Sequence, residues 1–421
     1  MTTEATTAPG SAHARRIMEH VERLSDCGDR FAGQPGDRPA ADYVEQSLRS
    51  VGLEVERTAA DLITFREDHC SLALADGTPL DATSAYYSPS TPGPIDAPLV
   101  YIGSGTEESY EGKHVEGAIV VLEEDALGYE LFWLGKYAER AAARGVAGIV
   151  VIHPFPWSYR MTMEFGGADL SRPFPDPSVP TVAISATSAL RVMSAIAGAN
   201  AIARFDLRTV VAPCVSDHVA GVLLGTRRPE ERVIVLAHRD IPIVPGANDN
   251  GSGTAAILEL ARLLADHRTE RSIVLLSVAG EEGRAQGTAS YIESLGAGIA
   301  NVKTAISIDM IAAGGPLRIV EEIHWPDRPE PARFTDWLME MLERSADRFG
   351  YQLERYRTEA GADAGRFLDA GVPSAWFWKP DDFRYHSRED KPEYMDANAV
   401  KATADIVADT VLTIAGADDA Q

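Results

Sequence analysis

Cysteine is scarce in this sequence, and the three residues present have no spacing typical of metal ligands. They are Cys27, Cys70 and Cys214 in 421 residues. An odd number of scattered thiols argues against a disulfide-stapled scaffold and against a cysteine-based zinc site. We expect reduced thiols in a cytoplasmic protein. Long hydrophobic runs are also absent, because no stretch approaches the roughly 20 apolar residues of a membrane span.

Positive charge is in deficit as well. The chain has 39 Lys and Arg residues against 63 Asp and Glu residues, for a formal net charge of −24. Such a balance disfavours nucleic acid and anionic membranes as partners. The start of the sequence contains no apolar segment of the signal-peptide type, so we predict a cytoplasmic location.

Hydrophobic residues make up 45% of the sequence, which is enough for a large core divided among two or three domains. Residues 1–9 are rich in Thr and Ala and are predicted to be disordered. Between about 80 and 200 the pattern predicts a small β-rich unit with its own core and no convergent set of acidic, His or Cys residues. The aromatic stretch 153–167 in this unit is interpreted as a surface loop, with a lid over a site as the alternative.

Strand and helix patterns alternate after Phe205. The predicted strands are 233–237, 273–279, 304–308 and 375–378, and the predicted helices are 254–267, 288–295, 332–349, 363–370 and 397–415. Earlier in the chain, helices are expected at 12–26 and 39–50, and strands at 53–57 and 61–80. This alternation predicts an α/β fold with a mostly parallel sheet that is covered by helices on both faces.

Histidine and carboxylate residues follow the ends of all four predicted strands. They are His238, Asp240 and Asp249 after the first strand, Glu281 and Glu282 after the second, Asp309 after the third and His386 after the fourth. Because the carboxyl ends of parallel strands meet at one edge of a sheet, where ligands bind in open α/β folds, we expect these side chains to converge.

The composition of this set favours divalent metal ions. Two His, two Asp and one Glu supply too many carboxylates for one tetrahedral zinc, but they suit two ions that share a bridging carboxylate and a water. Imidazole and carboxylate favour zinc, with cobalt or manganese as substitutes. His238 and Asp240 lie two residues apart and point the same way on an extended backbone, so Asp240 is expected to orient His238.

The adjacent Glu281 and Glu282 point to opposite sides if the backbone is extended. One of them can ligate a metal while the other accepts a proton from the water, which is the division of labour needed for metal-assisted amide hydrolysis. A charge pattern at a helix N-terminus would explain this pair alone, but not the whole set at the strand ends.

At these motifs the chain resembles the co-catalytic di-zinc exopeptidase family of bacterial leucyl aminopeptidases, aminopeptidase Y and glutamate carboxypeptidase II. The matching segments are His238 to Asp240, Asn248 to Gly253, Gly280 to Thr288, Asp309 to Met310 and Tyr385 to Asp390. The resemblance implies a zinc exopeptidase-like, phosphorylase/hydrolase-like fold, with a mostly parallel or mixed sheet sandwiched by helices. It also implies a protease-associated domain at 80–200, inserted into a discontinuous di-zinc peptidase domain of residues 10–75 and 205–418.

The resemblance also implies a role for each residue. His238 and Asp309 would hold one zinc, Glu282 and His386 the other, and Asp249 would bridge them through a segment with a cis peptide bond to Asn250. Glu281 would be the general base, with Asp240 as the residue that orients His238. Tyr385, Trp378 and Arg384 are predicted to contact substrate; the alternatives are core aromatic residues for the first two and a surface charge for the third.

Two departures from the family pattern concern substrate recognition and leave the metal ligands intact. Arg284 stands where the family usually has a glycine, and the segment from Ala360 to Ala364 lacks the Arg and the His of many members.

Several activities remain open on this evidence. An exopeptidase of aminopeptidase type is the predicted activity, and a homodimer formed through the inserted unit stays open. An amidase or deacylase of a small amide metabolite and a non-catalytic binding protein are alternatives. A carboxypeptidase would need cations near the site, and the sequence offers Arg239, Arg284, Arg366, Lys379 and Arg384.

Overall fold

The fold is built on a parallel sheet of four strands. In a computed structural model that describes residues 12–123, 134–153, 155–160, 179–198, 201–243, 245–324 and 329–416, these strands are β15 (Ser374–Trp378), β11 (Val302–Asp309), β9 (Arg228–His238) and β10 (Arg271–Val278). β10 and β15 are buried at every position, as parallel strands covered on both faces must be. All four predicted strands are confirmed. The predicted disorder of residues 1–9, and positions 154 and 161–167 of the stretch interpreted as a surface loop, lie outside the described residues. The surface-loop interpretation is wrong for Ser158, Tyr159 and Arg160, which are buried.

Antiparallel strands extend this core on both sides, so the sheet is mixed. On one side β12 (Leu317–Ile323) pairs with β15, and it also pairs with β13 (Ala332–Arg333) and β14 (Leu353–Thr358). The sequence did not reveal β12 and β14. In β14 only the last of six residues is buried, so its apolar pattern is too weak to predict a strand.

Helices cover both faces of the sheet. Successive residues of β9 point alternately to one face and to the other. One face packs α1 (Ala12–Ser25), α2 (Asp37–Ser50), α5 (Gly253–Leu264), α7 (Asp336–Phe349) and α9 (Ala397–Gly416). The other packs α6 (Gln286–Leu295) and α8 (Asp363–Asp369). The helix expected from residue 332 begins at Asp336, because Ala332 and Arg333 form β13. Within the described part of the chain, no helix is both long and apolar enough to span a membrane.

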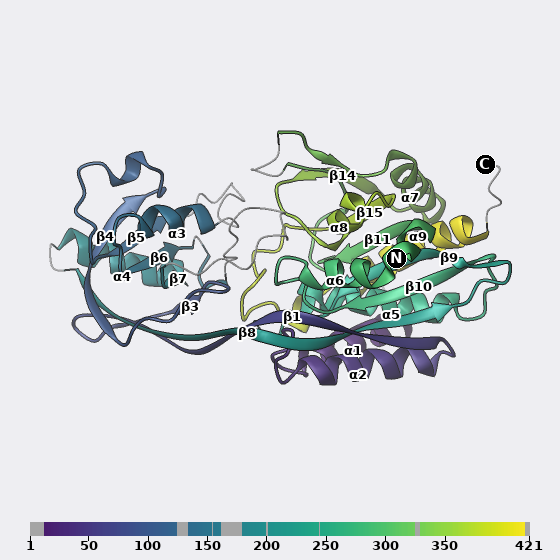
Figure 1. The fold of residues 1–421 in the computed structure, drawn as a ribbon, viewed down its shortest axis with the longest axis horizontal. Coiled ribbons are helices and arrows are strands. Elements are labelled where there is room, and N and C mark those ends of the chain that lie inside the picture. The colour runs from purple at the N-terminus through teal and green to yellow at the C-terminus, as the bar shows by residue number, and fades with distance from the viewer. Residues whose placement is uncertain are drawn as a thin grey trace, which may run out of the picture.

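A long two-stranded ribbon connects this part of the molecule to a smaller one (Figure 1). It consists of β1 (Glu54–Leu74) and β8 (Ile202–Leu223), paired antiparallel from Glu54 opposite Val222 to Leu74 opposite Ala203. β8 also pairs with β10 at one end and with β4 at the other. The predicted break between strands at 53–57 and 61–80 was wrong, because β1 is continuous against β8, a partner of similar length that was not predicted. The further strands expected up to residue 80 are confirmed, since Leu72 of β1 pairs with Leu80 of β2 (Pro79–Leu80) after a turn.

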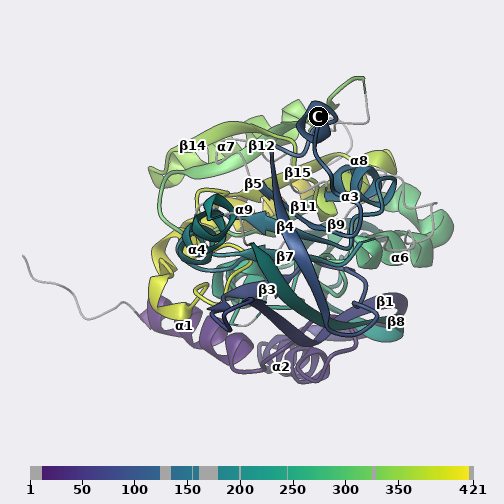
Figure 2. The same cartoon turned by 90° about the vertical axis from the view of Figure 1, so that its left-hand side faces the viewer.

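The smaller unit, residues 82–160 and 179–198 where described, has its own sheet. Its strands are β4 (Ile95–Gly103), β5 (Ile119–Glu123), β6 (Gly148–Ile152), β7 (Thr181–Ile184) and β3 (Ala82–Ser84). α3 (Leu134–Ala142) and α4 (Ala186–Ala197) pack on opposite faces of this sheet (Figure 2). The described residues also form shorter elements. These are β2 (Pro79–Leu80), the single turns at Glu108–Tyr110 and Pro392–Tyr394, the π-helical segment Ala247–Ser252 and the 3-10 helix Gly296–Asn301.

Gly287 is a packing requirement of this fold, and its substitution tests the close approach of α6 to the end of β10. A Cβ at Gly287 would lie 1.5 Å from the carbonyl oxygen of Ala279, the residue that directly follows β10, so the main chain there would have to shift. We expect Gly287→Ala to cost more than about 3 kcal/mol in free energy of unfolding, measured by urea denaturation. The control is Gly298→Ala, because a Cβ there meets nothing within 4 Å. Equal stability of the two variants would contradict the packing described.

Candidate metal centre

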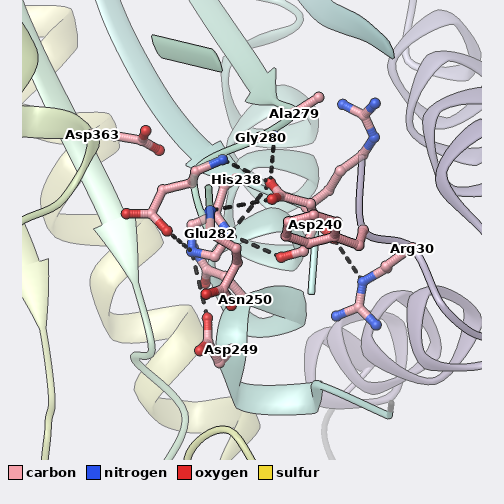
Figure 3. Close-up of polar contacts among 12 residues, drawn as sticks. Arg30, His238, Asp240, Asp249, Asn250, Ala279, Gly280, Glu282 and Asp363 are labelled. Carbon is pink, nitrogen blue, oxygen red and sulfur yellow. Dashed lines mark hydrogen bonds and ion pairs between the residues drawn. The ribbon is translucent and has the colours of Figure 1, made fainter. Parts of the chain in front are cut away.

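The predicted ligands lie at the carboxyl edge of the parallel strands. His238 is the last residue of β9 and pairs with Val278 of β10, after which the chain turns through Gly280 to the two glutamates. Asp309 is the last residue of β11. Strand register therefore brings these residues to one place, although they are far apart in sequence (Figure 3).

His238 occupies one side of the cluster. Its Nε2 lies 3.3 Å from Oδ1 of Asp309, 3.5 Å from Oδ1 of Asp249 and 3.9 Å from Oε2 of Glu281. The histidine is buried and faces three carboxylates, so its Nε2 and their oxygens enclose one small polar space.

His386 occupies the other side. Its Nε2 lies 3.1 Å from Oδ2 of Asp249 and 3.1 Å from Oε2 of Glu282. Asp249 thus directs one oxygen to each histidine, which is the placement that a bridging carboxylate requires. The peptide bond from Asp249 to Asn250 is cis, as the family resemblance implies.

Main-chain carbonyls fix the orientation of both imidazoles. Nδ1 of His238 lies 3.2 Å from the carbonyl oxygen of Asp240, and Nδ1 of His386 lies 3.0 Å from that of Arg160. A carbonyl oxygen can only accept, so each Nδ1 carries the hydrogen and each Nε2 faces the cluster. This is the usual arrangement of a metal-ligating histidine.

Asp240 acts differently from the sequence expectation. Its carboxylate is 3.8 Å from Nδ1 of His238, too far for a hydrogen bond, and only its carbonyl contacts that ring. The carboxylate instead accepts the main-chain N–H groups of Gly280 at 2.8 Å, Glu281 at 3.1 Å and Glu282 at 3.2 Å. Asp240 therefore fixes the turn that carries the two glutamates.

The unsatisfied atoms of the cluster fit a divalent cation. The buried Oε1 of Glu282 and Nε2 of His386 have no hydrogen-bond partner. His238, Asp249 and Glu282 each offer a ligand atom, and these atoms lie within 4.8 Å of one another. Buried carboxylates without cations are costly, and nitrogen and oxygen donors of this kind suit zinc.

Protons compete with a metal for these groups. Burial raises the pKa of Glu282 to about 7. Burial and the neighbouring carboxylates of Asp363 and Glu282 raise the pKa of Glu281 well above its usual range, against the opposing effect of His238. Burial alone would lower the pKa of His386, but Glu282 and Asp249 raise it to about 10.

Arg30 is a site residue that the sequence analysis missed. Its fully buried guanidinium donates from Nε to the carbonyl of Arg239 at 2.7 Å, from Nη1 to that of Pro245 at 2.6 Å, and from Nη2 to that of Gly246. These bonds shape the loop between His238 and Asp249 (Figure 3). The signal available in the sequence was a single basic residue between Asp29 and the apolar Phe31.

Asp390 supports the same loop from the other side. It accepts the main-chain N–H of Asn248 at 2.8 Å through Oδ1 and that of Asp249 at 3.0 Å through Oδ2. The family motif contained this residue, but only the structure shows that it holds the segment with the bridging aspartate.

The three predicted substrate residues differ in their surroundings. Tyr385 stacks on the ring of His386 with a centroid separation of 3.7 Å, which places it beside the cluster. Trp378 is buried, stacks on Trp376 and donates to Sδ of Met310, as a core aromatic residue does. Arg384 lies over the ring of Tyr394.

Arg284 adopts the backbone conformation that explains the usual glycine at its position. Its φ is 69°, and the φ of the following Ala285 is 50°. Both values lie in the left-handed region, which glycine enters without the steric cost that a side chain brings.

Comparisons with known proteins find similarity in the part of the chain that carries the cluster. The model of "Peptidase family M28" matches residues 218–411, a range that contains every predicted metal ligand. This region is therefore similar to peptidase family M28. The aminopeptidase YwaD of Bacillus subtilis is 22% identical over 408 residues, which are 94% of this chain and 83% of that protein. The probable lipoprotein aminopeptidase LpqL of Mycobacterium tuberculosis is 25% identical over 319 residues, 71% of this chain and 59% of LpqL.

Solved structures show the same fold as this protein. A zinc aminopeptidase from Bacillus subtilis superposes with a TM-score of 0.75 at 20% identity, over 97% of each chain. An aminopeptidase from Aneurinibacillus sp. strain AM-1 superposes with a TM-score of 0.72 at 22% identity, over 96% of this chain and 94% of that one. The similarity extends over both the larger part and the smaller unit.

Replacement of Arg30 tests its support of the loop. In Arg30→Met two buried carbonyls and one partly buried carbonyl lose their donor, so we expect a loss of about 3 kcal/mol in free energy of unfolding, measured in urea. The control is Arg204→Met. Arg204 pairs with Asp96 and both side chains are 60% exposed, so its loss should change the free energy of unfolding by less than about 0.5 kcal/mol. Equal effects of the two variants would refute the role given to Arg30.

The pH dependence of metal binding tests the electrostatics. Glu282 loses its proton as the pH rises through about 7, and the proton on His386 becomes easier to displace at higher pH. Zinc should therefore raise the melting temperature more at pH 8 than at pH 6, as measured by calorimetry at equal free zinc. A shift that is equal or smaller at pH 8 would contradict this assignment.

Proposed function

We propose that this protein is an exopeptidase of aminopeptidase type that hydrolyses peptide bonds with two zinc ions. The observation that carries the proposal is the convergence of two histidines and three carboxylates. Asp249 is the central carboxylate and directs one oxygen to each histidine. Family M28 is a peptidase family, and the relatives with matching sequences are aminopeptidases.

The proposed ligand sets follow the two sides of the cluster. His238 and Asp309 would hold one ion, and Glu282 and His386 the other, with Asp249 between them. Zinc, once bound, would polarise the scissile carbonyl and lower the pKa of the attacking water.

Glu281 is the proposed general base. It is not part of the ligand set, and its Oε2 lies 3.9 Å from Nε2 of His238, at the border of the cluster. A carboxylate with a raised pKa takes a proton from water readily and can pass it on to the leaving amine. Asp240 supports this step because its carboxylate holds the main-chain N–H of Glu281.

A carboxypeptidase is less favoured, because the cations it would use have partners within the protein. Arg239 is fully buried and pairs with Asp37, and Lys379 donates to the carbonyl of Ala313. The other engaged cations are Arg366, which donates to the carbonyl of Arg284, and Arg384, which pairs with Asp382.

We extend the proposal to the organisation of the chain. The smaller unit would be a protease-associated domain inserted at 80–200 into a peptidase domain of residues 10–75 and 205–418. Its compact sheet between two helices supports this division. A homodimer formed through this unit and a cytoplasmic location stay predictions.

A mixed panel of free, N-acylated and C-terminally amidated peptides tests the activity. With zinc-loaded protein we expect stepwise loss of residues from free N-termini. Mass spectrometry of the products detects this loss. In Glu281→Gln the catalytic efficiency should fall by about a hundredfold or more, at unchanged zinc content.

The alternatives give different products. Release of residues from the carboxyl end of the peptides would show carboxypeptidase activity and contradict the aminopeptidase proposal. Cleavage of N-acylated substrates alone would indicate a deacylase. Binding of zinc without cleavage of any peptide would refute the proposal.

A further inference from the structure

Among the described residues of the smaller unit, Tyr86 and Arg160 make hydrogen bonds to the metal centre, and both lie on the same side of it. Tyr86 follows β3, and Arg160 lies in the segment after β6. The hydroxyl of Tyr86 donates to Oε2 of Glu282 at 3.1 Å, and the main chain of Arg160 bonds to His386. Both contacts therefore go to the ligand pair that is proposed to hold the second ion.

Arg160 and His386 are joined by two reciprocal bonds. The N–H of Arg160 donates to the carbonyl of His386 at 2.9 Å, and Nδ1 of His386 donates to the carbonyl of Arg160 at 3.0 Å. The ring of the preceding Tyr159 stacks on the imidazole with a centroid separation of 6.1 Å. Ring position and tautomer of this histidine thus depend on a segment of the smaller unit.

Tyr86 is fixed as a donor to Glu282. It is fully buried, its ring meets that of His386 edge-on, and it also packs on Phe31 and Phe65. Its single hydroxyl hydrogen therefore sets the direction of one oxygen of Glu282.

A partly buried ion pair between Arg160 and Glu67 holds these two segments together. Glu67 of β1 accepts the main-chain N–H of Ser84 at 2.8 Å and its hydroxyl at 2.6 Å. The same oxygen, Oε2, lies 3.3 Å from Nη2 of Arg160, whose Nη1 donates to the Ser84 hydroxyl. The guanidinium also lies 5.3 Å from the centre of the Phe65 ring. This network connects the ribbon, the end of β3 and the loop with Arg160.

The other ligand pair is held differently. Nδ1 of His238 bonds to the carbonyl of Asp240, two residues along the same segment, and Asp309 ends a strand in the middle of the parallel sheet. The two sides of the centre therefore differ in their dependence on the smaller unit.

We propose that Tyr86 and Arg160 are positioning residues, through which the smaller unit determines how tightly the metal ion beside Glu282 and His386 is held. The inference rests on the proposed two-ion centre. Partners of this kind orient a ligand without touching the metal, and their loss typically weakens metal affinity by about tenfold to a hundredfold.

Cobalt titration of the full-length, metal-depleted protein tests this inference. Binding is measured by calorimetry and by visible absorption, which reports the ligand environment of each ion. In Tyr86→Phe one of two cobalt equivalents should bind about tenfold to a hundredfold more weakly, and the other should be unchanged. The matched control is Tyr87→Phe, which removes a hydroxyl that donates to the carbonyl of Ile63 and should leave both equivalents unchanged.

A second pair of variants addresses Arg160. Arg160→Met should weaken the same equivalent, and Arg160→Lys should restore part of the affinity because a cation again faces Glu67. Unchanged binding in both Tyr86→Phe and Arg160→Met, or equal weakening of both equivalents, would overturn the inference.

Failure of the proposed function would look different. Binding of two cobalt ions without peptide cleavage would refute the activity, while the titration would still decide the role of Tyr86. Binding of one equivalent to the unaltered protein would refute the two-ion centre. The role of Tyr86 and Arg160 would then depend on whether their variants weaken that single equivalent.

Discussion

The burial of several carboxylates at one edge of a sheet is the constraint on which this structure depends. Like charges so close together repel, and the low-dielectric interior makes an uncompensated charge costly. The raised pKa values of Glu281 and Glu282 express that cost, because protons take the place of a cation. A divalent metal ion removes this electrostatic cost. The cluster of carboxylates is therefore unfavourable without a metal and binds one strongly.

The protein maintains this arrangement with main-chain hydrogen bonds from buried charged residues. Arg30 holds three carbonyls of the loop before Asp249, Asp390 holds two N–H groups within it, and Asp240 holds three N–H groups of the turn with the glutamates. Each of these contacts fixes backbone rather than a ligand side chain. The ligand atoms are thereby left free to face the centre.

Residues at strand ends were predictable from the sequence, whereas residues that act from distant segments were not. His238 and Asp309 follow apolar strands, and parallel pairing alone brings such positions together. Arg30 acts on a residue 209 positions away, and Tyr86 on one 196 positions away, so no local pattern marks them. For the same reason the long ribbon was missed, since β1 and β8 depend on each other for continuity.

The central claim is that Asp249 and four side chains around it hold two metal ions, and anomalous diffraction at the zinc absorption edge tests it most directly. Crystals of the zinc-loaded protein should show two anomalous peaks. One should lie beside His238 and Asp309, the other beside Glu282 and His386, with Asp249 between them. A single peak would contradict the two-ion centre, and peaks only elsewhere would contradict the assignment of the site itself.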